Sequence, residues 1–267
     1  MAWAAMSALA GLLLALASPE ARSRTVLDLD TRAQPVALQD WGDYWIDSSG
    51  SLTAGQLARH ESLPWQPTGK KLIYPITSGQ AVWIRLNVPP APDAERWYLE
   101  VPYPALDRAS LYTLDGAGQW NEQQAGDLVA VSQWPVPHRH SLLPISLSAE
   151  VPTKYLLRLE NGHAFSAPLQ FISEARLSHS EQRVSLNLGI FFGLTGLAAL
   201  ISALSAVSLR DSVYGFYALC VTLMALTQAS ITGIAGLHLW PDWPWWNDIS
   251  SAVLPMLTVS STLLFIS

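Results

Sequence analysis

Hydrophobic and polar residues alternate along short runs in the first two thirds of the chain. In the clearest run, residues 82–88, one set of alternating positions is apolar and the other is larger or polar: Val82, Ile84, Leu86 and Val88 against Trp83, Arg85 and Asn87. A period of two places each set on its own face of a β-strand. Pro89 and Pro90 end this run, because proline cannot donate a hydrogen bond to a neighbouring strand.

Similar runs recur along the chain, separated by Pro, Gly, Asn and Asp. They cover residues 97–101, 109–113, 128–134, 142–147, 155–160 and 169–172, and one short helix is predicted for residues 53–59. Short strands with frequent turn residues are typical of a β-sandwich, jelly rolls included, rather than of a fold in which strands alternate with helices. The sequence therefore predicts an all-β jelly-roll or β-sandwich domain over residues 25–172.

Residues 178–267 follow a different pattern, with long apolar stretches that carry almost no charge. The charge-free stretches are 184–209, 212–241 and 249–267, and about 20 apolar residues span the hydrocarbon core of a bilayer. We expect the second span to end near Leu237. Ser178 and Glu181 have the spacing of a capping box, which predicts that the first helix starts at Ser178. The expected architecture is thus a β-domain followed by three transmembrane helices.

Composition and charge narrow the function classes. Only 13% of the 267 residues are charged, the formal net charge is −6, and no basic surface for nucleic acid is expected.

Residues 1–17 are apolar and end in Ala15-Leu16-Ala17, which predicts a signal peptide cleaved after Ala17; an uncleaved membrane anchor is the alternative. Both interpretations place the β-domain outside the cytoplasm. Arg210-Asp211 then lies inside, and the Trp-rich loop 240–246 returns outside.

Few motifs point to catalysis. The chain has no Gly-rich phosphate loop, no G-x-S-x-G and no metalloprotease helix motif, so we expect neither enzymatic activity nor a cofactor. His138 and His140 have a spacing found in metal sites, but no acidic ligand or third histidine follows them. We therefore expect solvated loop residues there and no metal site.

Aromatic and basic residues supply the candidate ligand-binding positions, which are Trp83, Arg85, Trp120 and Trp134. Tryptophan rings stack on sugars, but they also fill protein cores. Arg85 either anchors an anionic or sugar ligand, or is a buried arginine paired with a carboxylate such as Glu100. In the first span Gly189 and Gly193 form a GxxxG pattern, which lets another helix approach closely and also occurs by ordinary glycine use.

The order of these parts, together with several short motifs, resembles the bacterial 7TMR-DISM receptors, seven-transmembrane receptors with diverse intracellular signalling modules. The β part looks like their type 2 extracellular domain. The motifs that carry the resemblance are Tyr44-Trp45-Ile46-Asp47, Val82-Trp83-Ile84-Arg85-Leu86, Trp97-Tyr98-Leu99-Glu100-Val101, Pro104-Ala105-Leu106-Asp107 and, in the membrane part, Arg210-Asp211 followed by Tyr214 and Tyr217. The resemblance implies a periplasmic jelly roll that feeds a seven-helix bundle and a cytoplasmic kinase, cyclase or similar output. The sequence stops in the third span, so we expect a truncated receptor.

Two functions remain open at this point. The first is the sensory and transmembrane portion of a bacterial inner-membrane signal-transduction receptor, with its β-domain in the periplasm and carbohydrate as one candidate ligand. The alternative is a membrane-tethered carbohydrate-binding or surface-interaction module without signalling. The expected partners are a small-molecule or carbohydrate ligand, the lipid bilayer and, as a candidate, a second copy in a homodimer, with no nucleic acid.

Overall fold

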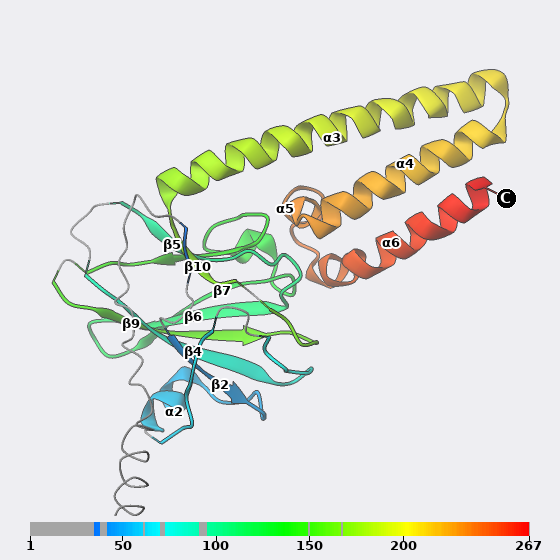
Figure 1. Cartoon of the computed structure of the whole chain (residues 1–267). Coiled ribbons are helices and arrows are strands. Elements are labelled where there is room, and N and C mark those ends of the chain that lie inside the picture. The colour runs from blue at the N-terminus through cyan, green and yellow to red at the C-terminus, as the bar shows by residue number, and fades with distance from the viewer. Residues whose placement is uncertain are drawn as a thin grey trace, which may run out of the picture.

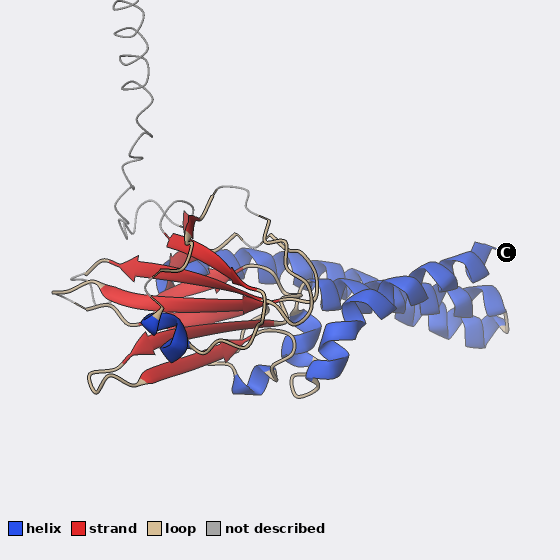
Figure 2. Cartoon of the chain, turned by 90° about the horizontal axis from the view of Figure 1, so that it is seen from below, coloured by secondary structure: helices blue, strands red, loops and turns tan. Residues whose placement is uncertain are grey.

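The computed structural model describes residues 35–37, 42–60, 62–69, 73–90, 95–148, 150–166 and 168–266. The predicted signal peptide, residues 1–17, lies outside the described residues. Figure 1 shows a domain of β-strands and a set of long helices that extend away from it. In Figure 2 the strands lie in layers and the long helices project from one end of these layers.

The β-domain is a sandwich of two antiparallel sheets, which confirms the predicted fold class. One sheet has the strand order β1-β10-β5-β8 and the other has the order β3-β2-β4-β9-β6-β7. The strands are β1 (Val36–Ala37), β2 (Gly42–Asp47), β3 (Gln66–Pro67), β4 (Ala81–Val88), β5 (Trp97–Val101), β6 (Arg108–Leu114), β7 (Trp120–Ala125), β8 (Ser141–Ile145), β9 (Thr153–Glu160) and β10 (Gln170–Ser173).

The main apolar core lies between the two sheets. It receives the alternating apolar side chains of β4 on one side and those of β5 and β10 on the other, including Val82, Ile84, Leu86, Trp97, Leu99 and Phe171. The alternation seen in the sequence of β4 is therefore the alternation between the inner and the outer face of the six-stranded sheet.

A smaller apolar cluster covers part of the outer face of the six-stranded sheet. The short helix α2 (Ala54–Arg59) begins there, and Thr53 and Gln56 cap it reciprocally. Ala54 and Leu57 from α2 pack against Trp83, which is fully buried. The predicted helix at 53–59 is thus confirmed, and it gives Trp83 an apolar environment on a face of the strand that would otherwise meet water.

Four helices follow the β-domain: α3 (Glu174–Leu209), α4 (Ser212–Ile231), the short α5 (Ile234–His238) and α6 (Pro244–Ile266). The helices α3, α4 and α6 are long and apolar enough to cross a membrane. α3 and α6 lead away from the β-domain, while α4 returns to it (Figure 1). The turn at Arg210 and Asp211 is therefore remote from the domain, and residues 232–243 lie beside it.

Two predicted element boundaries and one predicted strand are wrong. The first long helix begins at Glu174 with Ser173 as its N-cap, so Ser178 lies inside the helix. The second span ends at Ile231, before Leu237, because Gly233 takes a left-handed conformation that breaks the helix. Residues 128–134 form no strand but contain a short 3-10 helix, η1 (Val131–Gln133); Val131 and the C-cap residue Trp134 belong to the core.

Candidate functional site

A cleft of about 520 Å³ opens on the outer face of the six-stranded sheet, beside α2. Strands β2, β4 and β9 form its floor, because Asp43 and Leu156 are the cross-strand neighbours of Arg85. Trp65 and Trp120 add two partly exposed rings to the lining. The remaining lining residues include Leu57, Ala58, His60, Asn87, Leu114 and Lys154. A cleft of this kind combines apolar walls with a few polar groups that can orient a ligand.

Arg85 is held in a defined position within this cleft. Its Nε and Nη2 atoms lie 2.8 and 2.7 Å from Oδ2 of Asp43, which is buried beneath it. Its guanidinium carbon lies 4.7 Å from the centroid of the Trp65 ring, a distance at which a cation is attracted to an aromatic face. The expected pairing with Glu100 is wrong, because Glu100 lies on β5 in the other sheet. The expected burial is also wrong, because 49% of the Arg85 side chain is exposed.

The four candidate ligand-binding residues divide into two pairs. Arg85 and Trp120 both line the cleft. Trp83 is buried under α2, and its ring lies 5.5 Å from that of Tyr112. Trp134 is buried near the helices, and its indole nitrogen donates to the carbonyl of Val129 at 2.9 Å. Only the first pair is therefore placed to meet a ligand in this cleft.

A second functional region is the junction between the β-domain and α3. Ser173 is both the last residue of β10 and the N-cap of α3, so the strand continues into the helix without a linker. About two turns further along α3, Glu181 accepts hydrogen bonds from Nε and Nη2 of Arg139 at 3.0–3.2 Å. His138 Nε2 lies 3.5 Å from the same carboxylate. The helix is thus attached to the domain by covalent continuity and by a two-pronged ion pair.

The expected solvent exposure of His138 and His140 is wrong, because both rings are largely buried. Nε2 of His140 lies 2.5 Å from Oε1 of Glu100, and the other carboxylate oxygen accepts from Gln170. Burial, aided by the positive charges of His138 and Arg139, lowers the pKa of His140 to about 3. Burial also raises the pKa of Glu100, against the opposing effect of the Gln170 hydrogen bond. The physical cause of both shifts is burial: His140 directly precedes β8, Glu100 lies on the neighbouring strand β5, and their side chains are only 1% and 6% exposed.

The turn between α4 and α6 also contacts the β-domain. The amide of Val131 donates to the carbonyl of Pro241 at 2.8 Å, and the Ser132 hydroxyl donates to Asp242. Gly233, with φ +78°, approaches the backbone of Arg139 so closely that a Cβ would overlap its carbonyl oxygen. A cavity of about 260 Å³ remains between these surfaces, lined by domain residues such as Tyr103 and Asp127 and by helix residues such as Asn247 and Ser251.

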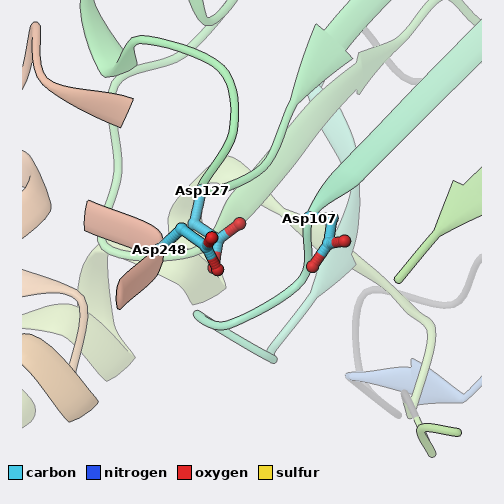
Figure 3. A group of neighbouring side chains, drawn as sticks. All are labelled: Asp107, Asp127 and Asp248. Carbon is cyan, nitrogen blue, oxygen red and sulfur yellow. The ribbon is translucent and has the colours of Figure 1, made fainter. Parts of the chain in front are cut away.

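Three aspartates meet where the domain contacts the start of α6. Asp107 and Asp127 come from the β-domain and Asp248 from α6, and one carboxylate oxygen of each lies within 4.8 Å of the others (Figure 3). Burial, followed by the charges of Asp248 and Asp107, raises the pKa of Asp127 to about 8. The electrostatic potential at this cluster of three aspartates is therefore negative.

Several residues of these sites carry no signal in the sequence that marks them. Asp43 lies on β2 and Lys154 on β9, and both line the cleft because these strands pair with β4. Their place in the cleft can be predicted only once that strand pairing is known. Asp107 is part of a motif that carried the family resemblance, but its neighbours Asp127 and Asp248 lie far from it along the chain. Only the contact between the domain and the helices brings the three together.

A β-sandwich that continues directly into apolar helices defines a membrane protein with a folded domain on one side of the bilayer. Residues 39–173 match the family described as 7TMR-DISM extracellular 2, and residues 185–267 match the family described as 7TM diverse intracellular signalling. The chain belongs to the 7TMR-DISM family, as the motifs predicted. Its two matched parts are those of a membrane sensory receptor, and neither is a catalytic domain.

Comparisons with individual proteins add little to this assignment. No curated protein matches the chain. Among solved structures, the chain is similar to one described as "Structure of CBM32-3 from a family 31 glycoside hydrolase from Clostridium perfringens". The identity is 16%, the match covers 41% of this chain and 74% of that chain, and the TM-score is 0.19. A likeness of this size carries no argument about the ligand.

Proposed function

We propose that this chain is the sensory and transmembrane portion of a receptor in a bacterial inner membrane, with its β-domain in the periplasm. The observation that carries the proposal is the double role of Ser173, which ends β10 and caps α3. A ligand that favours one arrangement of the β-domain would thereby favour one position of α3, since a ligand shifts an equilibrium by its differential affinity for two states. The signal passes to a cytoplasmic output module outside these 267 residues.

The cleft beside α2 is the proposed ligand site, and a carbohydrate is the proposed ligand class. Two features support this. Trp65 and Trp120 offer aromatic surface, which binds the apolar faces of sugar rings. Arg85 and Lys154 supply cationic hydrogen-bond donors at the same cleft, and Asp43 neutralises one of these charges. The remaining positive charge favours a sugar that carries a carboxylate.

The test uses the full chain purified in detergent and a panel of neutral and uronate-containing oligosaccharides. Isothermal titration calorimetry should show saturable binding of a uronate-containing sugar. Trp120→Ala and Arg85→Gln should weaken this binding about tenfold or more, which corresponds to the roughly 1.4 kcal/mol of one good contact. Trp245→Ala is the matched control, because Trp245 is 71% exposed and lies on α6, away from the cleft. Equal loss in the control, or no binding by any sugar, would contradict the proposed site.

The alternative function, a membrane-tethered module without signalling, can be tested with the same purified proteins. A tether needs no contact between the domain and the helices beyond the chain itself, whereas here Arg139 binds Glu181 and Val131 binds Pro241. Hydrogen exchange in residues 232–243 should change when the sugar binds at the cleft. Sugar binding with unchanged exchange in this turn and along α3 would support the tether.

A further inference from the structure

The three aspartates at the domain–helix contact are placed by separate elements. Asp107 precedes β6, Asp127 follows β7, and Asp248 lies in α6, near its start (Figure 3). Two backbone hydrogen bonds hold the first two together: the amide of Asp127 donates to Leu106, and the amide of Leu128 donates to the carbonyl of Asp107. Gly126, at φ +135°, permits this close approach, because a Cβ there would lie 2.5 Å from the Asp107 carbonyl oxygen. The β-domain thus presents a preformed pair of carboxylates to α6.

One oxygen of the buried carboxylate in this group is unsatisfied among the described residues. Asp127 is only 4% exposed, and the backbone amides of Asp127 and Leu128 hydrogen-bond its carboxylate, but its Oδ1 atom has no hydrogen-bond partner in the described part of the chain. A buried polar atom without a partner costs free energy, and a buried charge costs more unless it is paired or bound to a metal.

The charged groups around the cluster do not neutralise it. Glu160 adds a further negative charge near Asp107, and His163 is the basic side chain near the same carboxylate. Arg108 and Arg158 both pair with Glu160. Among the described residues, no ion pair within 4.0 Å includes any of the three aspartates.

We propose that Asp107, Asp127 and Asp248 bind a calcium ion that bridges the β-domain and helix α6. The donor set consists of carboxylate oxygens, which suit hard divalent cations. Two oxygens on one Ca²⁺ can be separated by at most twice the usual 2.3–2.6 Å bond length, or roughly 4.6–5.2 Å. The observed limit of 4.8 Å falls within that range. Water in the adjoining cavity between domain and helices can complete a coordination number of six to eight.

Such an ion would make the contact between the sensor domain and the membrane conditional on calcium. Two ligands belong to the domain and one belongs to α6, so the complete site exists only when the two parts are in contact. Calcium therefore stabilises the docked arrangement by binding to it and not to an undocked one. This site is separate from the cleft beside α2 and does not depend on what that cleft binds.

The experiment measures calcium binding to the full chain in detergent after exhaustive treatment with a chelator. Calorimetry with CaCl₂ should give about one site per chain, with a dissociation constant no weaker than the roughly 10⁻³ M of extracellular calcium modules. Asp127→Asn and Asp248→Asn should each lower the affinity about tenfold or more, since affinity depends on the number of charged ligands. Glu150→Gln is the matched control, because it removes an exposed carboxylate that precedes the start of β9, whereas Asp107 lies beside the other end of that strand.

Two further readouts separate binding from misfolding. Without calcium, both Asn variants should melt at or above the temperature of the wild type. Asp248→Asn removes a charge that repels its neighbours, and Asp127→Asn replaces a buried acid, whose charged form burial disfavours, with a neutral side chain of the same shape. With calcium, hydrogen exchange at residues 244–250 should slow in the wild type and in Glu150→Gln only. The proposal is overturned if the wild type binds no calcium at about 10 mM, if folded Asn variants bind as tightly as the wild type, or if Mg²⁺ binds equally well.

Discussion

Gly233, in the turn after α4, lies directly against the backbone carbonyl of Arg139 in the β-domain, with no room for a side chain between them. Its φ of +78° is in the left-handed region, which costs an L-residue about 1–2 kcal/mol. The glycine therefore meets two requirements at once, the break in the helix and the close approach of helix and domain.

Gly233→Ala should lower the melting temperature of the full chain in detergent. Both the backbone strain and the overlap with Arg139 act in that direction, and the turn must move away from the domain. Gly189→Ala is a matched control in the middle of α3, where a Cβ would meet no atom of the described residues within 4 Å. If both variants melt like the wild type, helix and domain are not in the described contact.

Trp83→Ala should destabilise the excised β-domain by roughly 3–5 kcal/mol, because the ring is fully buried under α2. We expect this excised domain to fold alone and to give a β-type circular dichroism spectrum, since its two sheets enclose their own core. Urea unfolding of the two proteins measures the difference. Trp120→Ala, which removes a partly exposed ring from the same cluster, should cost clearly less. A Trp83→Ala domain with unchanged stability would mean that the ring is not a core residue.

His140 should make the β-domain less stable as the pH falls from about 6.5 toward 3. Its pKa in the folded domain is about 3 against 6.5 for an ordinary histidine, so in this window the unfolded chain binds a proton that the folded chain does not. The expected slope from this residue approaches about 1.4 kcal/mol per pH unit. Glu100 acts in the opposite sense, because its raised pKa means that the burial cost of its charge disappears on acidification.

Urea unfolding between pH 7 and pH 4 isolates the histidine contribution when the wild type is compared with His140→Gln. Both proteins keep Glu100, and only the wild type has the buried imidazole. The variant should therefore lose less stability on acidification. Equal slopes would mean that His140 takes up its proton as readily in the folded domain as in the unfolded chain.

The proposed topology predicts the activity of alkaline phosphatase fused at three positions. Fusion after Gly162 should be active, fusion after Arg210 should be inactive, and fusion after Asp248 should be active again. The reason is that α3 leads away from the β-domain and α4 returns to it, so Arg210 and the domain lie on opposite sides. Activity of the Arg210 fusion would contradict a periplasmic β-domain, and with it the receptor function.

Strands whose two faces differ in character were predictable from the sequence. β4 alternates cleanly because its inner residues enter the main core, and the short helix α2 was predicted at residues 53–59. β7 was missed because it is an edge strand with a polar run, Asn121-Glu122-Gln123-Gln124. Residues 128–134 were wrongly predicted as a strand because their pattern is apolar. Val129, Val131 and Trp134 are indeed core residues, but turns and a short 3-10 helix carry them.

The start of α3 and the contents of the sites depended on tertiary structure. Ser173 and Ser178 are both plausible N-caps, and the end of β10 selects the first of them. Glu181, which the sequence assigned to a capping box, instead binds Arg139. The partner of Arg85 was assigned to the wrong carboxylate, because only the pairing of β2 with β4 brings Asp43 beside it.

Because no linker separates β10 from α3 at Ser173, a change in the orientation of the sheet would tilt the whole of α3 as a rigid rod. Its 36 residues rise about 54 Å at 1.5 Å per residue. A tilt of only about 5° at the sheet would displace the far end of such a rod sideways by about 5 Å. A shift too small to disturb the packing of the sandwich would thus reach Arg210 as a sideways movement of several ångströms, with Ser173 and the Arg139–Glu181 ion pair as the points at which the sandwich holds the helix.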